Sequence, residues 1–456
     1  MRSRTVVVAN RLPERMVEGQ WQTSTGGLVT AVAPLLREGN GIWIGWTGVA
    51  GDRTAPFTHD GIHQVPVPLD AAEVDEHYLG FSNATIWPLY HDAIRTPEFH
   101  RTWWRAYQRV NRRFAEVAAG FATPGDFVWV HDYHLQLVPQ MLRDLVPAAR
   151  IAYYLHIPFP PVEIYARNPW RAQLVAGLLA ANLVGFQTDL AAHNFRVAAS
   201  TFARGEIDGE WIRHPGGRTR VITAPISIDV DGFEGIASSP ETAAQAADLR
   251  EQLGSPKDVI LGVDRLDYTK GIDVRLRAFE TFLEQHPERA ADVSFVQVAV
   301  PSRETLSDYE DMRELIEQAV GRINGVHGGH HRMPVHYIYG EVPRELLVAY
   351  YVAADVMCVT PLRDGMNLVA KEYVVSRPQD DGVLVLSEFA GVANELDRAV
   401  LVNPYDIDGI VTALQTALEM PQAERRERMK AMKDQVRTHD VHAWAAQVID
   451  AMPEAP

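Results

Sequence analysis

The sequence predicts an α/β protein built from two doubly wound, Rossmann-like domains that face a central cleft. Two observations favour this fold class. Short Val/Ile-rich runs alternate with helical patterns along the whole chain of 456 residues, and apolar strands separated by helices are typical of parallel sheets covered on both faces. Polar and charged residues follow many of these runs directly, at the strand ends where open parallel sheets bind ligands.

The predicted strands form two series. The first half of the chain has six, at 5–9, 42–46, 127–130, 151–155, 183–186 and 220–224. The second half has another six, at 259–263, 294–300, 335–339, 355–360, 383–386 and 399–402. A Ser/Pro/Ala-rich stretch near 225–251 favours a boundary between the series. We therefore expect an N-terminal domain at 1–228, a C-terminal domain at 229–438, and a final helical segment at 439–456 that could pack back on the N-terminal domain.

Composition limits the function classes. The net charge of −16 argues against a nucleic-acid or anionic-membrane surface. No run approaches the roughly 18 apolar residues of a membrane span, and the N-terminal apolar run is too short for a secretory signal. The single cysteine, Cys358, lies in an apolar run and is interpreted as a buried core thiol in a reducing compartment. We expect a cytoplasmic protein with small-molecule substrates and no nucleic-acid or membrane partner, and a homo-oligomer stays open.

The stretch 361–372 follows a predicted strand and leads into a helical pattern at 367–376. A turn of this kind leaves backbone N–H groups free at the positive end of a helix, which is a ready site for an anion. Asp364 and Glu372 flank the turn with carboxylates, which suit sugar hydroxyls. The stretch could therefore hold a molecule that is part sugar and part phosphate. The alternative is an ordinary turn whose Asp364 caps the helix.

Cations follow other predicted strands. Arg265 and Lys270 are five residues apart across one turn, so both could reach one diphosphate, although pairing with Asp264 and Asp267 is the alternative. Four strand-end cations in an acidic chain suggest substrates with several phosphate charges: Arg11, Arg265, Lys270 and Arg303.

Other strand ends carry hydroxyl-binding candidates. Asp132 follows the strand at 127–130 and is well placed to accept from a sugar hydroxyl. His131 and His134 flank it, but the chain lacks a matching third or fourth metal ligand. His156 lies between a strand and a Pro-rich turn, where it is either a buried, satisfied histidine or a donor to a sugar oxygen.

Two further features have both a structural and a binding interpretation. Tyr78 and Trp87 either belong to the core or form a wall on which a sugar ring stacks. Gly26 and Gly27 precede a helical pattern, where glycines let the backbone approach a phosphate closely. No Gly-x-Gly-x-x-Gly follows the first strand, and no P-loop or Gly-x-Ser-x-Gly elbow is present. A dehydrogenase, a P-loop kinase and an α/β-hydrolase are therefore disfavoured.

Taken together, these motifs resemble the trehalose-6-phosphate synthases, a family of retaining nucleotide-sugar glycosyltransferases with the GT-B fold. The likeness runs through nearly the whole chain. Six blocks in order are its most specific part: 81–83 with 87–88, 131–135, 155–160, 265–268 with 270–271, 321–325 and 360–373.

The resemblance implies roles for the matched positions. It implies donor binding by Gly26, Gly27, His156, Arg265, Lys270, Ile338, Val342, Asp364, Gly365, Met366, Asn367, Leu368 and Glu372. It implies acceptor binding by Arg11, Tyr78, Trp87, Asp132 and Arg303, and a direct part in catalysis for Asp132, His156, Arg265, Lys270 and Asp364.

The implied reaction joins glucose from UDP- or GDP-glucose to glucose 6-phosphate, giving α,α-trehalose 6-phosphate without a metal or other cofactor. The nucleobase stays open, because base contacts in this fold are largely made by the backbone. A pseudo-glycosyltransferase that couples cyclitols, a non-catalytic sugar-phosphate sensor and a phosphorylase-like enzyme that uses pyridoxal phosphate are the alternatives.

Overall fold

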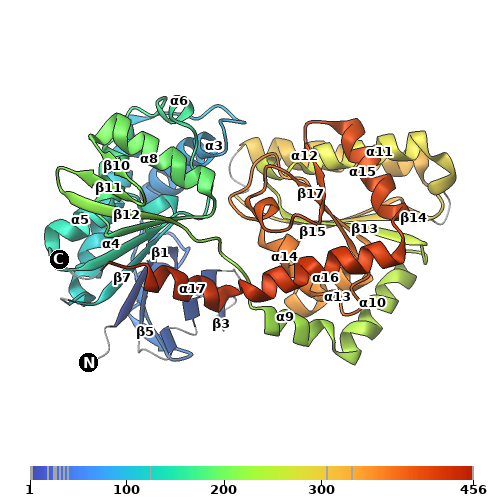
Figure 1. Ribbon diagram of the computed structural model, residues 1–456, viewed down its shortest axis with the longest axis horizontal. Helices are drawn as coiled ribbons and strands as arrows, with labels where there is room; N and C mark the ends of the chain where they lie inside the picture. Colours follow the sequence, from blue (N-terminus) through green and yellow to red (C-terminus); the bar gives the residue numbers. More distant parts are fainter. Residues whose placement is uncertain are drawn as a thin grey trace. The chain divides into compact units, whose positions relative to one another are not determined.

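The computed structural model describes residues 4–17, 20–23, 28–29, 32–33, 36–37, 41–123, 125–303, 307–329 and 332–453. The chain forms two compact units: residues 1–226 with 442–456, and residues 227–441. Each unit holds a largely parallel sheet with helices packed against it (Figure 1). The predicted α/β class with two such sheets is therefore confirmed.

The sheet of the first unit has ten strands within the described ranges, in the order β10-β11-β12-β9-β8-β7-β1-β4-β6-β5. The strands from β12 to β6 are parallel, and antiparallel strands complete both edges. Their bounds are β1 Thr5–Arg11, β4 Ile42–Trp46, β5 Phe57–His59, β6 Ile62–Pro66, β7 Phe127–His131, β8 Arg150–Tyr154, β9 Leu183–Phe186, β10 Glu206–Asp208, β11 Trp211–His214 and β12 Gly217–Thr223. A separate hairpin joins β2 Glu14–Val17 to β3 Gln20–Thr23.

The first unit also contains helices. They are α2 Ala71–Glu73, the π-helix η1 Val74–Ile86, α3 Trp87–Tyr90, α4 Arg101–Phe121, the 3₁₀ turn η2 Tyr133–Leu135, α5 Val138–Leu145, α6 Val162–Tyr165, α7 Arg171–Leu179, α8 Asp189–Ala203 and the last helix, α17 Val441–Asp450. Trp444 of α17 donates from its indole to Ala224 O at 3.0 Å, and its ring lies 5.1 Å from that of Trp129. These contacts fix the end of the chain on the sheet of the first unit.

The second unit has a parallel sheet in the order β15-β14-β13-β16-β17-β18. Its strands are β13 Asp258–Arg265, β14 Val293–Val300, β15 Val335–Tyr339, β16 Val356–Val359, β17 Val383–Ser387 and β18 Val400–Val402. Its helices are α9 Val230–Ala237, α10 Pro240–Gln252, η3 Tyr268–Lys270, α11 Ile272–Gln285, η4 Pro287–Arg289, α12 Ser307–His327, α13 Arg344–Ala353, α14 Leu368–Val375, η5 Gly391–Asn394, α15 Ile407–Glu419 and α16 Gln422–Thr438. Helices α11, α12 and α15 cover one face, and α9, α10 and α13 the other (Figure 1).

The predicted strands are all present, with ends that differ by up to three residues. The hairpin β2–β3, the parallel strand β6 and the strands β5, β10 and β11 near the sheet edges were not predicted, because they are short and lack apolar runs. His134 lies in the 3₁₀ turn η2. Cys358 is fully buried, and burial raises the pKa of its thiol to about 11, so the prediction of a core thiol is confirmed. No helix in the described part of the chain is long and apolar enough to cross a membrane.

Candidate active site

In the second unit, the turn after β13 meets the turn after β16. Lys270 Nζ donates to Asp364 Oδ2 at 2.6 Å, and the two side chains are 12% and 13% exposed. The backbone joins the same turns, because Leu362 N–H donates to Thr269 O at 2.7 Å. Of the sequence-predicted residues, Lys270 and Asp364 are thus brought into direct contact. Arg265, at the end of β13, is exposed to solvent.

A fully buried arginine supports this junction. Arg275 of α11 donates to Asp264 Oδ2 at 2.8 Å, to Thr360 Oγ1 at 3.0 Å and to Lys270 O at 3.3 Å. It therefore ties the end of β13, the end of β16 and the backbone of Lys270 together. Burial raises the pKa of Asp264, and the charge of Arg275 opposes this rise. Asp264 pairs with Arg275, whereas Lys270, which the alternative interpretation paired with Asp264 or Asp267, pairs with Asp364.

The turn that follows Asp364 is held in an uncommon backbone conformation. Asn367 has φ of +85°, and its side chain accepts from Ala370 N–H at 3.1 Å, so it caps α14. Its amide also donates to Asp364 Oδ2 at 3.1 Å. Asn367, and not Asp364, is therefore the helix cap. Among the described residues, none accepts a hydrogen bond from the N–H groups of 365–368, so these donors are open to an anion.

Gly391 packs directly against the backbone of this turn. A Cβ on Gly391 would lie 1.9 Å from Gly365 O, and Gly391 N–H donates to Asp364 O at 3.2 Å. Val392 N–H in turn donates to Met366 O at 2.9 Å. Only a residue without a side chain allows these two backbone segments to approach so closely.

Glu372 lies one turn along α14. It is half-buried, and its Oε2 accepts from Tyr351 Oη at 2.8 Å. Burial raises the pKa of Glu372, against the opposing effects of this hydrogen bond and of the charge of Arg344. Ile338 of β15 and Val342 beyond it are both half-buried at the carboxyl edge of the sheet.

Arg303 takes part in a buried cluster. It donates to Asp267 Oδ2 at 3.1 Å and also contacts Tyr309 Oη, and its side chain is only 4% exposed. Burial acts to raise the pKa of the fully buried Asp267, but the charges of Arg303 and Arg265 outweigh it and the pKa is lowered. The guanidinium of Arg303 therefore balances a carboxylate in this structure.

In the first unit, Arg11 at the end of β1 lies over aromatic rings. Its guanidinium carbon is 4.1 Å from the ring centroid of Trp46 and 5.2 Å from that of Tyr78. Tyr78 in turn stacks on His134, with centroids 5.8 Å apart. Tyr78 belongs to the π-helix η1, a rare backbone form that is frequent at functional sites. Trp87 is buried against Tyr133 and His91, so most of its ring belongs to the core.

Two histidines meet at the carboxyl ends of β7 and β8. His131 Nδ1 lies 3.1 Å from His156 Nε2, and the backbone N–H of His156 donates to Asp132 Oδ1 at 3.3 Å. Burial lowers the pKa of both rings, that of His156 to about 3. Both imidazoles are therefore neutral near pH 7, and one donates to the other. Asp132 has φ of +71°, so the chain turns sharply at this carboxylate.

Several residues that support the site were not predicted from the sequence, and two predicted residues lie outside the described ranges. Arg275, Tyr309, Tyr351, His131 and Gly391 were not predicted as site residues, and only His131 adjoins a predicted one. Gly26 and Gly27 lie outside the described residues. No group of three or more His, Cys, Asp or Glu side chains in the described ranges is arranged to hold a metal ion.

Comparison with known proteins decides the family. The profile of glycosyltransferase family 20 matches residues 3–454. The chain belongs to glycosyltransferase family 20. It is 50% identical to a trehalose-6-phosphate synthase of Mycolicibacterium gilvum, over 98% of this chain and 93% of the relative.

Solved structures of this family agree with that assignment. An Escherichia coli relative bound to UDP-2-fluoroglucose matches with a TM-score of 0.92 and 36% identity, over 99% of both chains. A Burkholderia xenovorans α,α-trehalose-phosphate synthase in complex with glucose 6-phosphate matches with a TM-score of 0.92 and 37% identity, over 99% of this chain and 100% of the other. The predictions of a GT-B fold, of a glycosyltransferase, and of glucose transfer from a nucleoside diphosphate glucose to glucose 6-phosphate are confirmed.

Proposed function

We propose that UDP-glucose is the donor in this reaction and that the turn contact between Lys270 and Asp364 marks the donor site. The contact carries the proposal because it sets a cation, a carboxylate and the open N–H groups of 365–368 in one place. Uridine is favoured over guanosine because the Escherichia coli relative binds UDP-2-fluoroglucose.

The donor roles follow from the chemistry of each group. Arg265 and Lys270 hold the diphosphate and stabilise the charge that develops on it as it leaves. Asp364 accepts from the glucose hydroxyls, and the N–H groups of Gly365, Met366, Asn367 and Leu368 hold phosphate and sugar oxygens. Glu372 accepts from the ribose, and the backbone near Ile338 and Val342 meets the base. Gly26 and Gly27 complete the phosphate contacts.

The acceptor roles fall to the remaining predicted residues. Arg11 and Arg303 bind the 6-phosphate, and Tyr78, Trp87 and Asp132 orient the glucose ring. His156 contacts the donor sugar. Since its Nε2 faces His131, its Nδ1 is the ring nitrogen left for a sugar oxygen.

Transfer then proceeds with retention at the anomeric carbon. The bond from that carbon to the diphosphate oxygen breaks, and a bond to the anomeric oxygen of glucose 6-phosphate forms on the same face. The leaving diphosphate oxygen takes the acceptor proton, so no enzymic nucleophile is needed. Asp364 is held by Lys270 and Asn367, which suits a hydroxyl ligand better than a nucleophile.

One assay tests the proposal. UDP-, GDP- and ADP-glucose are each supplied with glucose 6-phosphate, and the product is examined by NMR for its anomeric linkage. We expect UDP-glucose to give the highest kcat/KM and an α,α product. A clear preference for GDP- or ADP-glucose would refute the donor assignment. Transfer to a cyclitol phosphate in preference to glucose 6-phosphate would favour the pseudo-glycosyltransferase, and absence of turnover with every donor would favour the sensor.

A further inference from the structure

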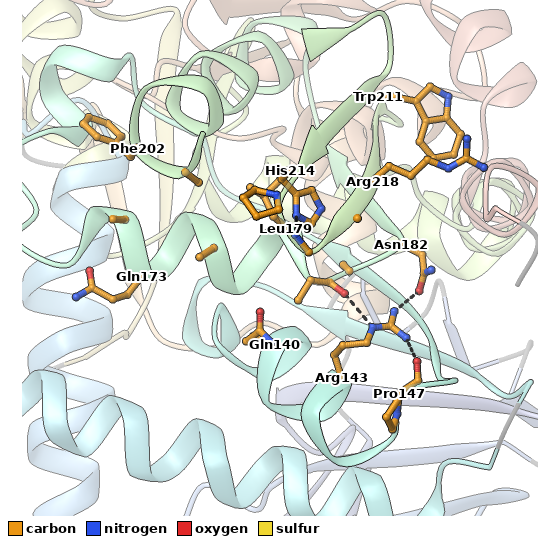
Figure 2. A pocket seen from close by; sticks show the side chains of 18 of the residues that line it. Gln140, Arg143, Pro147, Gln173, Leu179, Asn182, Phe202, Trp211, His214 and Arg218 are labelled. Atoms are coloured by element: carbon orange, nitrogen blue, oxygen red, sulfur yellow. Dashed lines mark hydrogen bonds between the residues drawn. The ribbon is translucent and has the colours of Figure 1, made fainter. Parts of the chain in front are cut away.

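A cavity of about 810 Å³ lies in the first unit between helices α5, α7 and α8 and the β11–β12 hairpin. We call it the hairpin pocket; Arg143, Ala176, Leu179, Phe202, Trp211 and Arg218 are among its lining residues. In the view of Figure 2, Trp211 and Arg218 lie together on one side, Phe202 lies on the other, and Arg143 lies below. Its volume is within the range of about 300–1,000 Å³ that is typical of small-molecule sites.

The hairpin pocket lies at the amino ends of the strands. Pro147 precedes β8, Asn182 precedes β9, and Gly217 begins β12, and all three residues line the pocket. His156, in contrast, follows the carboxyl end of β8. The five residues of β8 span roughly 16 Å at 3.3 Å per residue. The pocket is therefore separate from the candidate active site, and its assignment does not depend on the roles proposed there.

The pocket has uncompensated positive charge. Arg143 donates only to neutral oxygens. Among them are Asn182 Oδ1 at 2.6 Å and Pro147 O at 2.7 Å (Figure 2), and also Ala149 O at 2.6 Å. Arg218 lies over the ring of Trp211, 4.5 Å from its centroid, and no described carboxylate pairs with either guanidinium. The described lining includes no Asp or Glu. In a chain with a net charge of −16, this is an unusual local balance.

The third basic residue of the lining does not add to this charge. His214 Nδ1 accepts from Gly216 N–H at 3.2 Å, and its Nε2 lies 3.1 Å from Thr219 Oγ1. Burial lowers the pKa of His214, so the ring is neutral near pH 7. The charged donors that remain for a ligand are those of Arg218, beside the apolar surfaces of Trp211, Leu179 and Phe202.

We propose that the hairpin pocket binds an anionic small molecule that carries an apolar ring system. Arg218 makes charge-assisted hydrogen bonds to the anion, and the positive charge of Arg143 attracts the anion at longer range. Trp211, Leu179 and Phe202 cover the ring system. A neutral ligand of the same shape lacks the first two contributions and binds more weakly.

A pair of fluorescent probes tests this chemistry on the full-length enzyme. The anionic probe is 1-anilinonaphthalene-8-sulfonate, and the neutral probe is N-phenyl-1-naphthylamine, which has the same rings without the sulfonate. Both are titrated with UDP and glucose 6-phosphate at saturating concentrations, so that the catalytic site is occupied. We expect saturable binding of the anionic probe at one site per chain and binding of the neutral probe that is at least about tenfold weaker. Equal binding of the two probes, or displacement by UDP and glucose 6-phosphate, would overturn the proposal.

Three variants locate the binding site. Arg218→Ala removes the anion contact and should raise the Kd of the anionic probe about tenfold. Ala176→Trp fills the pocket from an exposed position on α7 and should abolish saturable binding of both probes. Arg213→Ala is the matched control, because Arg213 lies on the same hairpin, pairs with Asp208 and is not part of the lining. None of the three should change kcat/KM measured without probe. Unchanged probe binding in both Arg218→Ala and Ala176→Trp would refute the assignment.

Discussion

Lys270 Nζ lies 2.6 Å from Asp364 Oδ2, which joins residues 94 positions apart in the chain. We expect the partners of Lys270 and Asp364 to change when the donor binds. Without donor, the carboxylate neutralises the cation within a largely buried junction. A diphosphate would offer Lys270 a more highly charged partner, and Asp364 would then be free to accept from a sugar hydroxyl. The ion pair thus holds both side chains in place for the donor, and neither charge is buried without a partner before the donor binds.

Removing Lys270 or Arg265, the two proposed diphosphate-binding cations, should slow transfer strongly while the fold persists. We expect Lys270→Ala and Arg265→Ala each to lower kcat by about 10²–10³, because each loses charge stabilisation of the leaving diphosphate. Arg265 is exposed, and Asp364 keeps its bond to Asn367, so thermal unfolding should change little. Release of UDP measures the first effect and circular dichroism the second.

Arg277→Ala provides the control for this prediction. Arg277 is an exposed cation on α11 of the same unit and belongs to no predicted site. Turnover close to that of the parent enzyme in Lys270→Ala or Arg265→Ala would rule out the donor-site assignment.

Much of the local structure at the proposed donor site could be predicted, because its signals are local. A buried strand followed by Asp-Gly and a helical pattern already specifies a turn with open N–H groups, and the structure shows that turn at 364–368. The cations after β13 are local signals too. The supporting contacts were not predictable in this way. Arg275 lies in an ordinary amphipathic helix pattern, and its partner Thr360 is 85 residues away.

The surroundings of the proposed acceptor residues show a second limit of sequence reasoning. The segment 74–86 has no pattern that separates a π-helix from an α-helix, since the two differ only in which carbonyl each N–H reaches. The edge strands β5 and β10 are three residues long and largely polar, so no apolar run marks them. Burial of Arg303 against Asp267 likewise depends on residues 36 positions apart.

The burial of Arg303 predicts that this arginine supports both stability and acceptor binding, whereas Arg11 supports acceptor binding alone. Arg303→Ala leaves the fully buried Asp267 without its cation, so we expect a loss of stability of about 3–5 kcal/mol together with a higher KM for glucose 6-phosphate. Arg11→Ala should raise the same KM with little loss of stability, because Arg11 is exposed and stacks on Trp46 and Tyr78. Urea unfolding and initial rates at varied glucose 6-phosphate measure the two effects. An Arg303→Ala protein as stable as the parent would contradict the buried pair.

The pH dependence of stability should include a contribution from His77. Its ring is fully buried, neither nitrogen has a hydrogen-bond partner in the described structure, and burial with the charge of Arg113 lowers its pKa to about 3. An unfolded histidine titrates near pH 6.5. Between pH 6.5 and 3 the unfolded chain therefore binds a proton that the folded chain does not, and the free energy of unfolding falls as the pH falls.

His77→Leu removes this proton uptake. We compare the free energy of unfolding of the variant with that of the parent at each pH. The two pKa values, 6.5 unfolded and about 3 folded, predict that this difference is about 2 kcal/mol more favourable to the variant at pH 5 than at pH 8. Urea unfolding at both pH values measures the difference. If the difference between variant and parent is the same at pH 5 and pH 8, the histidine is not held neutral by burial.

The close approach of Gly391 to the turn 364–368, the proposed donor turn, gives the last prediction. A Cβ on Gly391 would lie 1.9 Å from Gly365 O, so Gly391→Ala must push the turn 364–368 away from η5. Because the open N–H groups belong to that turn, we expect a rise in the KM for UDP-glucose and a loss of kcat of at least about tenfold, since small misplacements of binding groups are costly.

Gly321→Ala controls for the added methyl group. Gly321 lies in helix α12, where a Cβ would meet nothing within 4 Å. Alanine favours the helix there, so stability should rise slightly and the kinetic constants should stay unchanged. In Gly391→Ala the KM for glucose 6-phosphate should stay unchanged, because the altered turn is assigned to the donor site. That KM therefore serves as an internal reference. A rise in that KM alone, with normal use of UDP-glucose, would show that the turn at 364–368 does not hold the donor.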